Sequence, residues 1–287
     1  MSATSLPLRG RRLRRPRNVT IAKHLILASV AVVIAFPFYW MLTTAFKSFF
    51  EATLFPPTLF PAAFHPENFA TAWEAAPWAR YFANTMIIVV LVTVGEITTA
   101  VLAAYAFARM RFRGKQLIFM LVLATLMIPS EATLIPSFVL VTKYLHWTNT
   151  LHVQIVPFLA SAFSIFLLRQ HFLSIPNELA DAARIDGAGH LRFLRSIVIP
   201  LSVPVLVTVA LITGIGVWDS FQWPLLVTSS DTVRPIQVGM AQFRTEFGAQ
   251  YHLEMAAATF VIAPIVVVFL IAQRHLIQGV ARTGIRG

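Results

Sequence analysis

Six apolar stretches divide the chain, and polar or proline-containing segments separate them. About 20 consecutive helical residues cross a hydrocarbon core, and each stretch has roughly that length. The pattern therefore predicts an all-α, polytopic membrane protein with six transmembrane helices. The expected spans are 25–46, 84–108, 116–138, 151–168, 202–226 and 255–273.

The composition agrees with a membrane protein. Apolar residues make up 57% of the 287 residues and charged residues 12%, whereas about a quarter of a soluble domain is charged. With a mean hydropathy of +0.72, the chain has too little polar surface for a globule in water, which excludes a soluble enzyme. The 24 Phe residues exclude a disordered chain, and the absence of Cys excludes disulfides and Cys metal sites.

Basic residues predict the orientation, because short cytoplasmic segments retain Lys and Arg. With the N-terminus inside, 18 of the 23 Lys and Arg fall on the inner side. Both termini are therefore expected in the cytoplasm: a basic tail over 1–24, one membrane domain over 25–273 and a second tail over 274–287. No small-x-small site follows the first apolar stretch, which favours an uncleaved anchor over a signal peptide or a nucleic-acid arm.

Catalytic motifs are missing from the sequence. It contains no G-x-x-x-x-G-K-[ST] phosphate loop, no H-E-x-x-H zinc pair and no G-x-S-x-G elbow. We therefore predict a non-catalytic subunit that binds no cofactor or metal itself. An ion-coupled carrier is the alternative, although such a carrier normally has a denser set of charged partners than Glu96, Glu131 and Asp219.

Two short helices joined at a glycine are predicted between the fourth and fifth spans, within residues 171–200. On the first helix, one face combines Leu179, Ala182, Ala183 and Asp186. Gly187 permits a sharp reversal, and the second helix is expected to present Leu191, Leu194 and Val198 on its own apolar face. A compact projection with a small-residue face suits docking to another protein.

The string E-L-A-D-A-A-R-I-D-G-A, residues 178–188, resembles the EAA loop of permease subunits of bacterial ABC importers. The leading acid of the EAA triplet is Asp181 instead of Glu, which keeps the charge on a shorter side chain. Other strings resemble the carbohydrate-uptake branch, with its maltose-type and glycerol-phosphate-type permeases: ANTMIIVVL, AYAFARMRFRGK, LMIPSEATLIP, FLLRQHF, WDSFQWPLL and RHLIQGVARTGIRG.

This resemblance implies a type I importer permease in the bacterial plasma (inner) membrane, surrounded by lipid. Its partners would be a second homologous permease, a cytoplasmic ATPase dimer that binds ATP and Mg²⁺, and an extracytoplasmic solute-binding protein; nucleic acid is not a partner. The solute would be a sugar or sugar-like molecule, with glycerol 3-phosphate or another non-sugar solute as the alternative. The coupling residues carried over are Glu178, Asp181, Ala182, Ala183, Arg184, Asp186 and Gly187.

Candidates for the solute path are short polar groups and tryptophans, because a sugar stacks its CH faces on aromatic rings while its hydroxyls need hydrogen bonds. These candidates are Asn84, Glu131, Trp218, Asp219, Gln222 and Trp223. The alternative is that they form helix contacts or an interfacial belt. Glu96 matches no family motif, so its role is open. No Arg lies inside a predicted span, which disfavours an anionic glycerol phosphate unless the partner permease supplies the cation.

Overall fold

A computed structural model describes residues 17–247 and 250–283 as a set of helices, with no β-strand among them. The α-helices are α1 (Arg17–Ala45), α2 (Phe49–Ala52), α3 (Glu67–Glu74), α4 (Trp78–Arg109), α5 (Lys115–Ala124), α6 (Ser130–Val139), α7 (His152–Ile155), α8 (Ala162–Ser174), α9 (Asn177–Ile185), α10 (His190–Phe193), α11 (Ile199–Leu201), α12 (Val203–Trp218), α13 (Gln222–Val227), α14 (Ile236–Phe247) and α15 (Tyr251–Thr283). Short 3₁₀ and π segments connect several of them. The predicted all-α class is confirmed.

Within the described residues, three helical segments are long and apolar enough to cross a membrane unbroken: Lys23–Ala45, Trp78–Arg109 and His152–Ser174. Two bent pairs would raise the number to five: Lys115–Met127 with Ser130–Tyr144, at 96°, and His190–Leu201 with Val203–Trp218, at 78°. The apolar part of α15, Tyr251–Val267, is shorter. The count of six spans therefore stays a prediction.

The third expected span, 116–138, is not one straight helix. Its first part ends at Met127, Ile128 is extended, and α6 begins after Pro129. Proline lacks a backbone N–H and disfavours the α conformation in the residue before it. The sequence run Ile128-Pro129 therefore explains why this segment divides into two helices.

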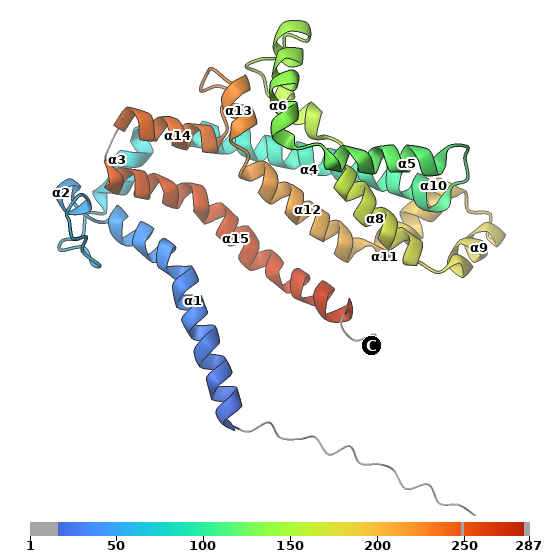
Figure 1. The fold of residues 1–287 in the computed structure, drawn as a ribbon, viewed down its shortest axis with the longest axis horizontal. Coiled ribbons are helices and arrows are strands. Elements are labelled where there is room, and N and C mark those ends of the chain that lie inside the picture. The colour runs from blue at the N-terminus through green and yellow to red at the C-terminus, as the bar shows by residue number, and fades with distance from the viewer. Residues whose placement is uncertain (1–16, 248–249, 284–287) are drawn as a thin grey trace, which may run out of the picture.

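The described helices form an elongated body with α4 running through it (Figure 1). α4 packs most extensively against α8 and α12, while α1 contacts α15 near one end and extends away from the other helices. α9 lies at one end of the body, and α2 and α3 lie at the opposite end (Figure 1).

The start of α4 is bonded to the segment that precedes α14. The Tyr81 hydroxyl donates to Asp231 Oδ1 at 2.8 Å, and Arg234 Nη1 lies 2.6 Å from the same oxygen. The Tyr81 hydrogen bond, followed by the Arg234 guanidinium, holds the pKa of the Asp231 carboxyl below its usual value. Asn84 Nδ2 donates to the carbonyls of Thr232 and Arg234 at 3.1 and 2.9 Å. This polar cluster fixes α14 against α4.

Replacing Gly239 by alanine is expected to destabilise the protein. An added Cβ would overlap Cδ2 and Cε2 of the Tyr81 ring, which cannot move freely because its hydroxyl is bonded to Asp231. Overpacking of this kind costs about 1–3 kcal/mol. Thermal unfolding of the purified protein in detergent measures the loss. Gly216→Ala is the control, because no heavy atom outside its own local helix backbone lies within 4 Å of that Cβ; equal unfolding temperatures for the two variants would contradict the packing argument.

Candidate functional site

The segment 171–200 forms the predicted projection of two short helices. α9 ends in a Schellman turn, in which the Ala188 N–H donates to the Ala183 carbonyl at 2.8 Å and the Gly187 N–H to the Arg184 carbonyl at 3.0 Å. Gly187 has a φ of +74°, a left-handed conformation that glycine adopts without a steric penalty. α10 begins at His190, and a π-helix over Leu194–Val198 continues from it.

The exposed face of α9 differs from the predicted docking face at one residue. Ala183 is only 6% exposed and packs into the core beside Phe172 and Leu194, so its assignment to the docking surface is wrong. The other coupling candidates are exposed: Glu178, Asp181, Ala182, Arg184, Asp186 and Gly187. Arg184 Nη1 lies 3.1 Å from Asp181 Oδ1, an exposed pair worth little in stability.

The apolar face predicted for the second helix is also partly wrong. Leu194 and Val198 are buried, but Leu191 is 73% exposed. Ile185 at the end of α9 is 87% exposed, although no sequence pattern marks it. α10 has a single turn before the backbone widens into a π-helix, so α-helical spacing does not hold across it. Ile185 and Leu191 are the most exposed large apolar side chains of this projection.

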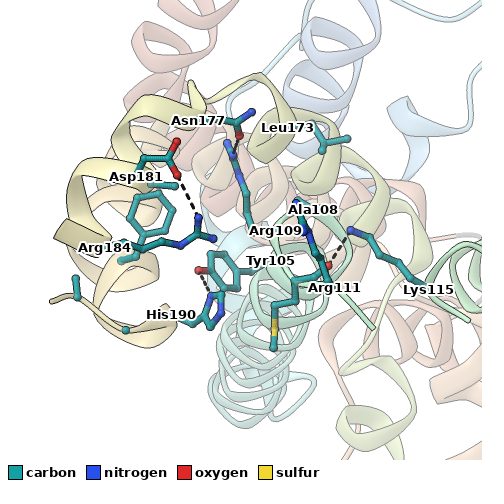
Figure 2. A pocket seen from close by; sticks show the side chains of 15 residues that line it. Tyr105, Ala108, Arg109, Arg111, Lys115, Leu173, Asn177, Asp181, Arg184 and His190 are labelled. Carbon is teal, nitrogen blue, oxygen red and sulfur yellow. Dashed lines mark hydrogen bonds and ion pairs between the residues drawn. The ribbon is translucent and has the colours of Figure 1, made fainter. Parts of the chain in front are cut away.

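Side chains of α4 hold both helices of the projection in place (Figure 2). Arg109 donates from Nη1 to Asn177 Oδ1 at 2.6 Å, and from Nη2 to the carbonyls of Phe172 and Ile175. The Tyr105 hydroxyl lies 3.0 Å from His190 Nδ1 at the start of α10. The end of α4 is thus bonded to the start of each short helix, and a displacement of the projection must move α4.

A cavity of about 600 Å³ lies between the end of α4 and the projection. Figure 2 shows Arg109, Arg111, Lys115 and Arg184 around it, with Asp181 as the acidic residue among those that line it. Lys115 Nζ donates to the Met110 carbonyl at 3.0 Å. This end of the molecule therefore presents an excess of positive charge beside the exposed side chains of Ile185 and Leu191.

Three of the six solute-path candidates come together in a second cavity of about 550 Å³. Asp219 caps the end of α12, Gln222 opens α13, and Trp223 follows; all three line this space with Ser130, Thr133 and Ser137. The Trp223 indole N–H donates to the Val153 carbonyl at 3.0 Å, which fixes its ring. The structure therefore places a carboxylate, an amide and a fixed aromatic ring around one cavity.

The other three candidates do not line this cavity. Asn84 is buried and uses its amide to bind the backbone before α14. Trp218 is buried in a packed cluster, with its ring 6.2 Å from that of Phe82. Glu131 is exposed at the start of α6 and accepts a hydrogen bond from Ser130 at 3.1 Å. Asn84 and Trp218 thus make packing contacts in this structure, and Glu131 lies outside the linings of these cavities.

A third cavity, of about 360 Å³, was not identified from the sequence. Glu96 lines it, together with Gln154, Thr213 and Trp223 among others. The signal available in the sequence was the presence of a carboxylate near the middle of an apolar span, a position where charge costs about 3 kcal/mol or more and is a functional hypothesis by default. Across residues 17–247 and 250–283 there is no group of three or more His, Cys, Asp or Glu that could hold a metal ion.

Comparison with known proteins gives three results. The family model of the "binding-protein-dependent transport system inner membrane component" matches residues 96–282. The arabinooligosaccharides transport system permease protein AraQ of Halalkalibacterium halodurans is 35% identical over 75% of this chain and 76% of its own length. The sn-glycerol-3-phosphate transport system permease protein UgpE of Yersinia pestis is 34% identical over 92% of this chain and 96% of its own length.

A solved structure has the same fold. A chain of a bacterial ABC transporter involved in the import of the acidic polysaccharide alginate superposes with a TM-score of 0.80 at 23% identity, covering 92% of this chain and 98% of that one. The likeness extends over nearly the whole helical body, and the family match covers well over half of the sequence. The chain therefore belongs to the family of inner membrane components of binding-protein-dependent transport systems.

Proposed function

We propose that this chain forms half of the translocation pathway of an ATP-driven importer for a sugar or a sugar-like solute. Permeases of this family are non-catalytic inner-membrane subunits that carry no cofactor, and they work with a second permease, separate ATPase subunits and a solute-binding protein. ATP and Mg²⁺ would be bound by the ATPase subunits. The arabinooligosaccharide relative favours a sugar, and the glycerol-phosphate relative keeps that solute as the alternative.

The observation that carries this proposal is the rigid projection over 171–200. Its first helix ends in a fixed turn at Gly187, Arg109 and Tyr105 bond it to α4, and Pro200 lies just before α12. Ile185 and Leu191 add uncovered apolar surface, which on a soluble face marks a protein contact. An ATPase subunit that binds this projection and changes conformation would move α4 and α12 together.

The distribution of charge supports a cytoplasmic position for the projection. The basic residues at that end include Arg109, Arg111, Lys115, Arg184 and Arg192. Loops with this excess of Lys and Arg stay on the cytoplasmic side. By the same rule we propose that both termini lie inside and that the chain crosses six times, with α15 as the sixth crossing.

Transport would then follow from a shift between two populations of the complex. Closure of the ATPase dimer displaces the projection, and the attached helices open the cavities toward the outside. Solute and nucleotide can shift this equilibrium only by binding the two states with different affinity. The permease contributes the coupling surface and the solute path, and the energy comes from ATP bound elsewhere in the complex.

Replacing Ala182 by aspartate is expected to abolish solute-stimulated ATP hydrolysis and uptake in proteoliposomes, because a charge would enter the small-residue docking face. Membrane-inserted protein should remain at the wild-type level, since Ala182 is exposed. Ala183→Asp should instead lower the amount of folded protein, because a buried unpaired charge strongly destabilises a fold. Full uptake by Ala182→Asp would refute the docking assignment, and Ala182→Ser is the conservative control.

A further inference from the structure

We infer that the cavity around Glu96 is a solute subsite that accepts hydroxyl groups of a neutral sugar and disfavours anionic solutes. This inference rests on the proposed function as an importer and adds the chemical class of the solute. It concerns the cavity between α4, the start of α8, α12 and α13, which is separate from the coupling projection.

Glu96 is held rigidly with half of its carboxylate unused. Its side chain is almost fully buried, at 7% exposure. Oε1 accepts from the Ser164 hydroxyl at 2.5 Å and from the Thr213 hydroxyl at 3.0 Å. No described residue donates a hydrogen bond to Oε2, and no Lys or Arg forms an ion pair with the group. Oε2 therefore lacks a donor, and a solute that brings hydroxyl groups would provide one.

Gln154 supplies a second acceptor on the same cavity. It is 2% exposed, and its Nε2 is occupied by the Val233 carbonyl at 3.0 Å. Its Oε1 is buried and accepts no hydrogen bond. An unsatisfied buried carbonyl oxygen costs about 1–3 kcal/mol. Gln154 Oε1 is covered in this conformation, so it can accept from a solute only when the cavity widens. Glu96 is the acceptor on the cavity in the present conformation.

The remaining walls fit a sugar ring. Trp223 and Phe158 provide aromatic surface, and Ser161, Thr213 and Ser220 provide hydroxyls. Among the described residues that line the cavity there is no Lys or Arg. A phosphate or a uronic-acid carboxylate would thus meet the Glu96 charge without a cation to balance it, whereas a neutral polyol would meet acceptors and an aromatic face. The volume of about 360 Å³ is within the range of small-molecule sites.

This cavity adjoins the one that contains Asp219 and Gln222. Phe158, Ser220 and Trp223 line both. The two spaces are therefore neighbours that share one wall. Glu96 is bonded to α8 through Ser164 and to α12 through Thr213, so any movement of these helices changes the subsite.

The natural absence of cysteine permits a direct test in the assembled importer. Ser220→Cys introduces one thiol where the two cavities meet, and Ser137→Cys introduces one in the neighbouring cavity, whose lining does not include Glu96. Each variant is exposed to a cationic and to an anionic methanethiosulfonate reagent of similar size. Modification of this chain is followed by mass spectrometry, so cysteines in the partner subunits do not interfere.

We expect the thiol at position 220 to react at least about tenfold faster with the cationic reagent, because a cleft of one charge concentrates the opposite ion. Asp219 lies beside position 220 and also attracts cations, so Glu96→Gln should lower the ratio severalfold without abolishing it, while the ratio for the Ser137→Cys thiol should not change. Millimolar arabinotriose should slow the reaction at position 220, and an alginate trisaccharide or glycerol 3-phosphate should not. A ratio that is insensitive to Glu96→Gln, no reaction with either reagent, or protection by the anionic solutes would each overturn the inference.

A second pair of variants separates charge from packing. Ser164→Ala and Thr213→Val remove the donors to Oε1 but keep the carboxylate, so the preference for the cationic reagent should persist in both. If they lose it as fully as Glu96→Gln does, Glu96 acts only as a packing group. ATP-driven uptake of arabinotriose is measured in parallel. Absent uptake with selective labelling would refute the importer proposal alone, and uptake with unselective labelling would refute the subsite alone.

Discussion

Gly187→Val is expected to lower ATP-driven uptake at least tenfold, although the protein should still insert and fold. Gly187 has a φ of +74°, and a left-handed backbone costs an ordinary L-residue about 1–2 kcal/mol and a β-branched residue more. Since about 1.4 kcal/mol corresponds to tenfold, the turn that orients α9 against α10 would be rarely formed. Uptake and ATP hydrolysis by the reconstituted complex are the measurements, and hydrolysis should lose its dependence on solute.

Gly189→Val is the matched control for this prediction. Gly189 lies two residues away in the same turn, and no heavy atom lies within 4 Å of an added Cβ at either glycine. Its φ of −74° and ψ of 172° suit any residue. Because both glycines have room for a side chain and differ in backbone conformation, similar uptake by both variants would show that the turn geometry at Gly187 does not carry the coupling.

The second large effect is expected from Arg109→Ala. This change removes the charged donors to Asn177 and to the carbonyls of Phe172 and Ile175, and hydrogen bonds to charged groups contribute about 1.5–3 kcal/mol each. The projection would then keep the Tyr105–His190 bond but lose the bonds that join α9 and the residues before it to α4. We expect uptake to fall more than tenfold and the unfolding temperature to drop, while ATP hydrolysis by the complex continues.

Arg111→Ala tests whether charge alone explains that result. Arg111 lines the same cavity, is exposed, and forms none of the bonds that Arg109 forms. It should retain most of the uptake. Arg109→Lys gives an intermediate case, because a single ammonium cannot reproduce the forked contacts of the guanidinium. Equal losses from Arg109→Ala and Arg111→Ala would mean that the positive surface matters and the bonds to α4 do not.

Features set by local sequence were predicted well. The glycine turn at 187 depends on a few neighbouring residues, and it is present. The break at Pro129 follows the same local rule, although the expected span 116–138 was drawn through it. The inward position of Ala183 depends instead on which side of α9 faces the helix core, and the pattern of small residues did not distinguish its two sides.

The solute-path residues were harder to predict because their surroundings come from distant parts of the chain. Asn84 donates hydrogen bonds to carbonyls about 150 positions away, which uses both N–H groups of its amide. Glu96 on α4 and Gln154 on α7 line the same cavity, and neither has a sequence neighbour that indicates a cavity. Only Glu96 was conspicuous in the sequence, as a carboxylate in an apolar span, and the structure shows what lies around it.

The attachment of the projection at two points has a consequence for how the gate can move. Asn177 and His190 are each bonded to α4, and Pro200 lies just before α12. No long flexible linker therefore separates the projection from these two helices, and a conformational change of the ATPase is transmitted to both. Conformations in which the projection is only partly displaced would then be unstable, and the gate should open in an all-or-none transition. Distance distributions between spin labels on α4 and α12 should accordingly resolve into separate peaks instead of drifting continuously as nucleotide is added.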